Sequence, residues 1–598
     1  MKSRIVRRGE GFALEACGRT IPLYGYMTYL PGRGRYRAFG DAGVPLVFVP
    51  VYLGDRGINQ ESGIRPFFRG IWTGEDRYDF TPAEEAFRLA SAGDALLIPR
   101  IMTEPPSFWD EAHPEELCRS IDGTPAHASF SSAVRMRDVT KALEAFNVWC
   151  RESGWSERIV GWHLAGGNTE EFLRPLPGPG FRGDYSPPAL RAWHAFSGTD
   201  RDPPTPEKRQ AFPTDPEVRR YNEFLSVSTA DMIVGLCREG RRITEGTIPM
   251  GAFYGYLVNV TDPERGHAAV SRILASDAVD FLASPFSYPN ARSLGQDWPI
   301  PGPAASARLH GKPWFMEADV RTCLTEPLKN AAPDSAPHDN HRYEGGVWAG
   351  PDTEAKSLSA MTKALGSILC SGCAAWWFDM WGGWYDSPAF MDFHRKAREL
   401  FAGARYVSRA DTAVLLNEEL IYARPSPGFA AAAHEGLLES LARTGAAFDV
   451  YDRRDMDLID FGRYRAVIFP GECGPLPEAG DCVRIGTGGA SPYRESGASE
   501  LRLSDPAPDW PILRDALSEA GVHFYSRGGD VVTAGGDFLC VHAVTAGEKE
   551  LLLPRNGTLT DAFTGEELLR DGRRAVIFLD AEDTRLFEVR YSSEEADK

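Results

Sequence analysis

The sequence predicts an α/β protein whose residues 1–407 fold into a (β/α)8 (TIM) barrel. Eight short apolar runs support this prediction, at 21–29, 44–53, 95–102, 159–167, 247–256, 279–288, 312–320 and 374–381. Most are followed by helix-like or loop segments, and this alternation is typical of a closed parallel barrel. The runs are apolar at consecutive positions, as expected of strands that are buried on both faces.

Helices and loops are expected between the runs. The stretches 82–92, 138–152 and 217–239 are predicted helices. The stretch 175–188 is rich in Pro and Gly and is predicted to be a loop after the fourth run. Loops at this end of the strands form the active face of a barrel.

Two changes of pattern indicate two further domains. From residue 408, the segments TAVLLNEEL, AAFDVYD and YRAVIFPG are predicted strands with helices between them, including one at 433–444. They indicate a small α/β domain with a partly parallel sheet at 408–522. From residue 523, the short apolar segments are separated by Gly, Asn and Asp turns, which is typical of an antiparallel β domain at 523–598.

Composition excludes several classes of protein. The 598 residues include 84 acidic and 65 basic side chains, for a formal net charge of −19, so the chain lacks the basic surface of a nucleic-acid binder. No apolar stretch of about 18 residues predicts a membrane span. The first residues have no apolar core of a secretory signal, and the 10 Cys are scattered as in proteins with reduced thiols. We therefore expect a cytoplasmic protein.

Two of the apolar runs lead into glutamates. Strand alternation puts Glu317, at the end of the seventh run, on the same side as Phe315. The fourth run continues into Gly-Gly-Asn-Thr-Glu-Glu, so that Glu170 or Glu171 points into the barrel mouth and its neighbour faces outward. Carboxylates at this end of a barrel strand are typical of catalysis. The alternatives are a salt bridge from Glu317 to Arg321 and a solvated helix start for the adjacent pair.

The positions of these glutamates predict a chemistry. Strands four and seven lie on opposite sides of a barrel mouth, so their carboxylates can face each other across a substrate. Glycosidic bond cleavage uses such a pair: one acid protonates the leaving oxygen and the other attacks or stabilises the anomeric carbon. The sequence predicts an exo-acting glycosidase without metal or cofactor. A non-catalytic sugar-binding protein on a degenerate barrel is the alternative from another class.

The chain resembles glycoside hydrolase family 42 of clan A. The resemblance rests on Trp162, the Glu170/Glu171 region, Glu317 and the segment TEPPSFWDEAHPEEL at 103–117. It implies a retaining β-glycosidase of the β-galactosidase kind, with the acid/base on strand four and Glu317 as the nucleophile. It also implies a flavodoxin-like second domain, a small third β domain and a homotrimer. Clan members of this layout cleave β-galactosides, β-mannosides and other β-linked sugars.

Two departures from the family pattern suggest a sister family. The clan has Asn directly before the acid/base, whereas here Thr169 precedes Glu170 and Asn168 lies one position earlier. Glu170 is preferred as the acid/base, with Glu171 as the alternative. Many family members bind zinc through a cysteine cluster after strand three, but only Cys118 lies in that region, so no zinc is expected.

Further candidates for substrate contact lie at or near strand ends, each with core packing or a loop role as the alternative. They are Arg100, Glu104, Asn168, Tyr254, Tyr288, Trp377 and Asp379. The resemblance implies a sugar platform for Trp377 and contact with the nucleophile for Tyr288. Asn168 is expected to bind a sugar hydroxyl or the opposite carboxylate, unless it is only a turn residue.

Overall fold

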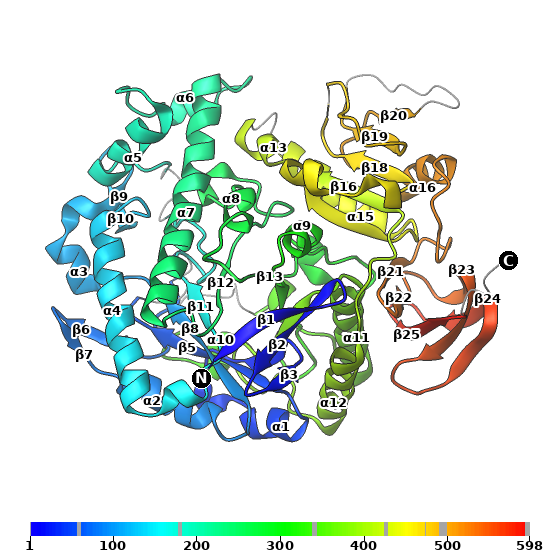
Figure 1. Cartoon of the computed structure of the whole chain (residues 1–598), viewed down its shortest axis with the longest axis horizontal. Helices are drawn as coiled ribbons and strands as arrows, with labels where there is room; N and C mark the ends of the chain where they lie inside the picture. Colours follow the sequence, from blue (N-terminus) through cyan, green and yellow to red (C-terminus); the bar gives the residue numbers. More distant parts are fainter. Residues whose placement is uncertain are drawn as a thin grey trace.

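The structure is a computed structural model that describes residues 2–56, 61, 63–176, 182–337, 344–423, 428–472, 474–489 and 499–592. Eight parallel strands close into a barrel in the order β11-β12-β13-β14-β15-β4-β5-β8 (Figure 1). They are β4 Tyr24–Met27, β5 Leu46–Tyr52, β8 Leu96–Met102, β11 Trp162–Ala165, β12 Met250–Phe253, β13 Phe281–Pro285, β14 Trp314–Ala318 and β15 Ala374–Phe378. Each lies inside one of the eight predicted runs, which confirms the TIM barrel.

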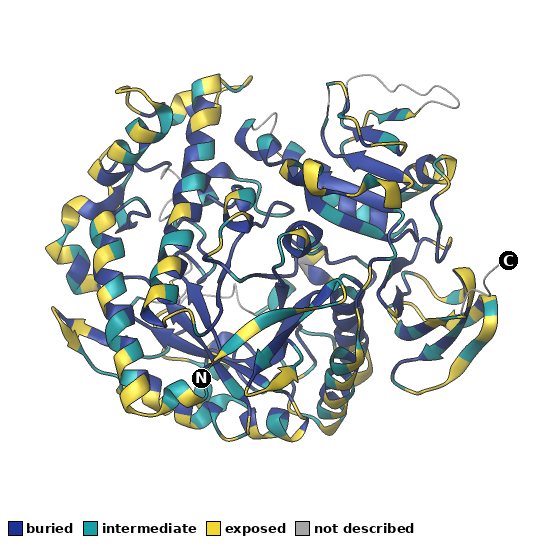
Figure 2. Cartoon of the chain, in the orientation of Figure 1, coloured by how far each residue is buried: buried dark blue, intermediate teal, exposed yellow. Residues whose placement is uncertain are grey.

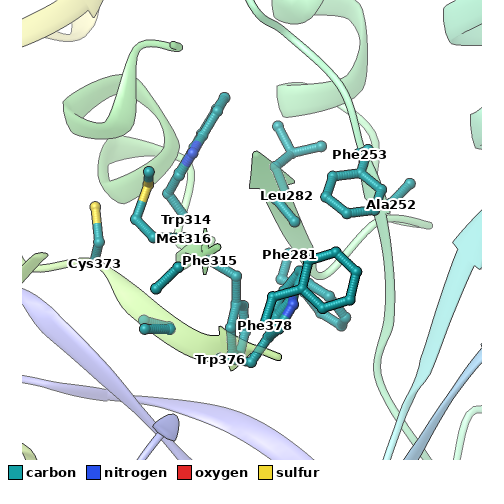
Figure 3. Close-up of a cluster of buried hydrophobic side chains, with 14 of the residues drawn as sticks. Ala252, Phe253, Phe281, Leu282, Trp314, Phe315, Met316, Cys373, Trp376 and Phe378 are labelled. Atoms are coloured by element: carbon teal, nitrogen blue, oxygen red, sulfur yellow. The ribbon is translucent and has the colours of Figure 1, made fainter. Parts of the chain in front are cut away.

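Aromatic side chains fill the barrel interior. The ring of Trp376 lies 4.3 Å from that of Phe48 and 5.8 Å from those of Phe253 and Phe315 (Figure 3). His163 is enclosed by the same rings, and burial holds its pKa well below the usual value. The barrel is therefore a packed core, and a binding or catalytic site can lie only at its mouth.

Helices surround the barrel, and Figure 2 shows their exposed outer faces against buried strands. The three predicted helices are α2 Thr81–Ala90, α4 Ala133–Glu152 and α7 Pro216–Ile243. α4 begins five residues earlier than predicted because the Ser132 hydroxyl caps it by accepting the N–H of Arg135. The other helices of this part are α1 Tyr36–Asp41, α3 Ser107–Ala112, α5 Pro187–Ser197, α6 Pro206–Gln210, α8 Val270–Leu274, α9 Ala304–Leu309, α10 Leu328–Ala331, α11 Glu354–Cys370 and α12 Pro388–Gly403.

Short antiparallel sheets accompany the barrel and were not predicted. The first is β1 Ser3–Arg8, β2 Gly11–Ala16 and β3 Arg19–Ile21 at the start of the chain. Two small hairpins lie in loops, β6 Trp72–Gly74 with β7 Arg77–Tyr78 and β9 Leu117–Arg119 with β10 Pro125–Ala128. The predicted loop 175–188 gives way to α5 at Pro187, and residues 177–181 of it lie outside the described residues.

A five-stranded sheet follows the barrel, in the order β17-β16-β18-β19-β20. Its strands are β16 Thr412–Leu416, β17 Phe448–Asp452, β18 Ala466–Phe469, β19 Val483–Thr487 and β20 Glu500–Leu503, and every pair is parallel. The accompanying helices are α13 Glu418–Ala423, α14 Phe429–Ala431, α15 Leu437–Ala442 and α16 Trp510–Glu519. The sequence order 2-1-3-4-5 across the sheet is that of flavodoxin-like folds.

An antiparallel sheet completes the chain, in the order β21-β22-β25-β23-β24. Its strands are β21 Val531–Gly535, β22 Phe538–His542, β23 Gly547–Asp561, β24 Glu567–Leu579 and β25 Thr584–Tyr591. It packs on α11, where Gly366 has no side chain and so lets Cys540 approach closely. No helix in the part of the chain that the structure describes has the length and apolarity needed to cross a membrane.

Candidate active site

Arg100 of β8 joins the two predicted catalytic strands. Its Nη1 donates to Oε2 of Glu317 at 2.6 Å, and its Nε lies 2.7 Å from Oε2 of Glu170. The second contact is an ion pair without an aligned hydrogen bond, because the Nε–H does not point at the carboxylate. Arg100 and Glu170 are each only 1% exposed. Carboxylates from opposite sides of the barrel mouth thus meet at one guanidinium.

Aromatic rings surround this guanidinium. Its central carbon lies 4.5 Å from the ring centroid of Phe253, 5.5 Å from that of Tyr29 and 5.6 Å from that of Phe378. The rings stabilise the cation and exclude water from it. In such a dry site, charge interactions are stronger than they would be in solvent.

The loop at 166–173 delivers Glu170 and Glu171 from beyond the end of β11. Four of its residues have left-handed φ values: Gly167 (67°), Thr169 (56°), Glu170 (67°) and Phe172 (56°). Such values cost non-glycine residues free energy, on the order of 1–3 kcal/mol each, so the surroundings must hold them in place. The loop is folded tightly back on itself, because Gly166 and Asn168 form isolated bridges with Glu171 and Leu173.

Side chains from elsewhere hold this loop. Oε1 of Glu104 accepts the N–H of Gly167 at 2.8 Å and pairs with Arg135 at 2.6 Å. Burial lowers the pKa of His267 to about 3, so its ring is neutral at physiological pH. His267 Nε2 lies 2.7 Å from the carbonyl oxygen of Glu171 and must carry the proton, since a carbonyl only accepts.

Glu171 is the less buried of the two adjacent glutamates. Its Oε2 accepts the hydroxyl of Thr169 at 2.5 Å, and the phenol of Tyr256 lies beside it without an aligned hydrogen bond. Burial raises the pKa of Glu171 to about 7, against the opposing effect of these hydroxyls. Among the described residues, Glu171 forms no ion pair. It is therefore suited to hold a proton near neutral pH.

Glu317 is almost completely buried. Burial raises its pKa to about 8, Arg100 opposes that rise, and the negative charges of Asp319 and Glu171 add to it. Burial also raises the pKa of Glu170, again opposed by Arg100. The site thus contains three glutamates and one arginine at the end of the barrel.

Asp319 anchors a second charged cluster just beyond β14. It is completely buried and forms ion pairs with Arg292 and Arg321, and it accepts the Tyr288 hydroxyl at 2.7 Å. Burial alone would raise the pKa of Asp319, but the two arginines and the tyrosine hold it below its usual value. Asp319 therefore remains an anion across the neutral pH range.

No protein-family model matches the chain, and no curated protein matches its sequence. Solved structures do match. The β-galactosidase from Bacillus circulans sp. alkalophilus has a TM-score of 0.61 at 13% identity, covering 95% of this chain and 99% of that one. A family 42 β-galactosidase from G. stearothermophilus, solved as a catalytic mutant, has a TM-score of 0.60 at 12% identity, covering 98% and 100%. The chain has the family 42 fold.

The family 42 fold is not confined to β-galactosidases. An α-L-fucosidase, isoenzyme 2 from Paenibacillus thiaminolyticus, has a TM-score of 0.55 at 12% identity, covering 96% of this chain and 100% of that one. At such identities the likeness establishes the fold alone.

Within the family 42 fold, several predicted residues do come together. Arg100, Glu170, Glu171 and Glu317 share one site, as the contacts above show. Tyr288 contacts Asp319, which is two residues beyond Glu317.

Two other candidates lie at the loop. Glu104 supports the loop from beneath by accepting the N–H of Gly167. The side-chain oxygen of Asn168 is buried and has no hydrogen-bond partner among the described residues.

Three candidates face away from the site, and their predicted substrate contacts are corrected. The ring of Trp377 is 0% exposed and packs on Phe393 and His394 of α12, since alternation along β15 turns Trp376 inward instead. Both oxygens of Asp379 are used to hold the turn after β15, where they accept the Tyr26 hydroxyl and backbone N–H groups.

Tyr254 is the third correction. Its hydroxyl donates to the carbonyl oxygen of Ser226 on α7 at 2.8 Å, outside the barrel. Tyr256, two residues later, lies beside Glu171 instead. Among the described residues, no group of three or more His, Cys, Asp and Glu side chains is arranged to hold a metal ion.

Sequence reasoning missed the roles of Asp319 and Trp381. Asp319 and Arg321 follow Glu317 at two-residue intervals, so extending the strand alternation would have found both. Arg321 pairs with Asp319, and no ion pair between it and Glu317 is present. Trp381 reaches the mouth beside Tyr29, with ring centroids 6.2 Å apart. Nothing in the sequence distinguished Trp381 from the other tryptophans at and after the eighth strand.

Proposed function

We propose that this chain is a retaining, exo-acting β-glycosidase that works by double displacement. The observation that carries the proposal is the meeting of carboxylates from strands four and seven at Arg100. Retaining glycosidases need one carboxylate as nucleophile and a second as acid/base. The family 42 fold supports the proposal, and the chemistry requires neither a metal nor a cofactor.

Glu317 is proposed as the nucleophile. A nucleophile must be ionised, and the hydrogen bond from Arg100 Nη1 stabilises the anion of Glu317 directly. Asp319 would oppose ionisation, but Arg292 and Arg321 offset its charge. Glu317 also lies at the C-terminal end of β14, where it is anchored by a rigid strand.

Glu171 is our choice for the acid/base, although the sequence favoured Glu170. A general acid must be protonated before it acts, and the ion pair with Arg100 favours the charged form of Glu170. Glu171 is less buried, forms no ion pair among the described residues and has a pKa near neutrality. In this assignment, Glu170 orients Arg100 and does not transfer a proton.

Glu171 and Glu317 are expected to titrate as a coupled pair, because the charge of Glu171 raises the pKa of Glu317 and the charge of Asp319 raises the pKa of both. Their pKa values of about 7 and about 8 lie close together. After one of the two carboxyls has ionised, the remaining proton is shared between Glu171 and Glu317. The pKa of Glu317 is the higher of the two even with Arg100 beside it, so the reactive form, with the negative charge on Glu317 and the proton on Glu171, is the minor singly protonated form of the pair.

A bell-shaped pH profile of kcat/KM is expected from this pair, with its maximum between the pKa values of about 7 and about 8. Below that window both carboxyls are protonated and Glu317 cannot attack. Above it neither holds a proton and the leaving group is not protonated. Initial rates with an alkyl glycoside across the neutral range measure this. With a dinitrophenyl glycoside, which needs little acid assistance, the alkaline limb should flatten; a profile that keeps rising with pH would contradict the assignment.

Hydrolysis of a panel of nitrophenyl glycosides tests the proposed function itself. We expect turnover of at least one β-glycoside with retained anomeric configuration, which NMR of the first-formed product detects. Binding without turnover of any sugar would support the sugar-binding alternative instead. The panel should include β-galactosides, β-mannosides and α-fucosides, since the family 42 fold does not select among them.

We also propose a cytoplasmic homo-oligomer, most simply a trimer assembled through the flavodoxin-like sheet. The support is the resemblance of this sheet to the oligomerisation domain of family 42. Light scattering at micromolar concentration should then give about three times the chain mass of 65.8 kDa. A species of single-chain mass alone would refute the oligomer.

A further inference from the structure

The cluster beyond β14 carries an excess of positive charge. Arg292 and Arg321 share one carboxylate, that of Asp319, and all three side chains are at most 5% exposed. Arg292 is well satisfied, since it also donates to the carbonyl oxygens of Phe286 and Ser287. Burying a cation without a matching anion is costly. The second arginine of the cluster therefore needs an explanation.

Arg321 uses only one side of its guanidinium. Its Nη1 donates to the carboxylate and the carbonyl oxygen of Asp319, both at 2.6 Å. Its Nε and Nη2 are buried and form no aligned hydrogen bond among the described residues, although the Tyr288 hydroxyl lies beside Arg321. These two N–H groups form the edge of the guanidinium that binds a carboxylate by two parallel hydrogen bonds. The unused edge thus has the geometry of an anion receptor.

The surroundings of this edge contain a further free donor. The guanidinium of Arg321 lies 5.2 Å from the ring centroid of Trp384 and 4.9 Å from that of Trp348. The indole N–H of Trp384 is also buried and lacks an acceptor among the described residues. Three buried N–H donors without an acceptor among the described residues therefore lie within two neighbouring side chains, Arg321 and Trp384.

An aromatic wall links this place to the catalytic carboxylates. Trp348 stacks near Trp381 with ring centroids 6.3 Å apart, and Trp381 lies beside Tyr29, whose ring faces Arg100. On the other side, the charge of Asp319 perturbs both Glu317 and Glu171. The anion receptor and the proposed catalytic pair therefore belong to one barrel mouth. Aromatic walls of this kind suit the apolar faces of sugars.

We propose that Arg321, assisted by Trp384, binds the carboxylate of a uronic acid residue in the substrate. The inference rests on the proposed function and deepens it, by naming an acidic sugar as the class that the site selects. The carboxylate would accept from Nε and Nη2 of Arg321 and balance the surplus charge of the cluster. A neutral galactoside would leave these donors without partners, and this penalty discriminates against it.

Matched pairs of substrates test this preference. The 4-nitrophenyl β-glucuronide and β-galacturonide are compared with the β-glucoside and β-galactoside by kcat/KM. We expect at least one uronide to exceed its neutral partner by about tenfold or more. Arg321→Met should lower the uronide-to-neutral ratio by about 10²-fold, because two charge-assisted hydrogen bonds are lost. Arg321→Lys keeps the positive charge but cannot form two parallel hydrogen bonds, and it should lower the ratio by less than Arg321→Met does.

Arg220→Met serves as the matched control. Arg220 also stacks on an aromatic ring, 4.1 Å from the centroid of Phe196, but it lies at the surface of α7. Its substitution should leave the ratio unchanged. If Arg321→Met does not fold, Arg321→Lys carries the comparison.

A binding experiment separates failure of the inference from failure of the proposed function. Free glucuronate and galacturonate should raise the Tm of the wild-type chain but not that of Arg321→Met, with glucose and galactose as neutral controls. Hydrolysis of neutral glycosides without uronide preference or uronate binding would overturn the inference and leave the proposed function intact. Uronate binding that depends on Arg321, without hydrolysis of any glycoside, would support the inference and overturn the proposed function. Preference for a 6-sulfated galactoside over both uronides would also overturn it, in favour of a sulfate ester.

Discussion

Glu317→Gln should lower kcat by about 10³-fold or more, since a positioned nucleophile lowers the barrier by several kcal/mol. The substitution keeps the size of the side chain and its place at the end of β14. It removes the carboxylate that Arg100 contacts at 2.6 Å, and with it the proposed site of the glycosyl-enzyme bond. Steady-state rates on the best substrate of the glycoside panel measure the effect.

Glu144→Gln provides the control for this substitution. Glu144 lies on α4 with an exposed side chain that pairs with Arg242 at the surface. An exposed pair of this kind contributes little to stability, so its rate should match that of the wild type. Thermal melting establishes that both variants are folded. A folded Glu317→Gln with kcat within tenfold of the wild type would show that Glu317 is not the nucleophile.

Glu171→Ala should produce the second large effect, and one that depends on the leaving group. Alkyl glycosides need protonation and should lose about 10²–10⁴-fold, the usual contribution of a general acid. Dinitrophenyl glycosides should be cleaved at nearly normal rates until the glycosyl-enzyme accumulates. Added azide should then restore turnover and give a glycosyl azide of retained configuration, because it attacks the intermediate on Glu317 without base assistance.

Glu170→Ala is the matched comparison at the adjacent position. It leaves Arg100 with one carboxylate instead of two, so it should impair all substrates alike and azide should not rescue it. Rescue of Glu170→Ala in place of Glu171→Ala would reverse the two roles. If neither variant is impaired, or if the product is inverted, the double-displacement assignment is wrong.

The barrel could be predicted from the sequence because the pattern that marks each strand is local in the chain. A strand buried on both faces needs consecutive apolar residues, and each of the eight runs contains one observed strand. Glu317 could be placed for the same reason, since the end of a strand and the alternation of its side chains can be read from the local sequence. The two later sheets were recognisable for the same reason, although the order of their strands was not.

The loop that presents Glu170 and Glu171 was beyond sequence reasoning. Left-handed φ values at Thr169, Glu170 and Phe172 are locally unfavourable, and a local pattern therefore predicts against them. They persist because the loop is held by side chains from other elements, including Glu104 at the N–H of Gly167. Those contacts exist only after the barrel has closed.

What the sequence by itself determined was which segments are strands and which of them end in carboxylates. Only the tertiary structure decided which of two adjacent tryptophans faces the barrel interior. Trp376 and Trp377 are adjacent and point apart along the strand, and the local sequence does not show which of them faces inward. The register of β15 pairs Trp376 with Glu317 and turns Trp377 toward α12. Register and loop closure depend on contacts between residues far apart in the chain, and for that physical reason the choice cannot be made from local sequence.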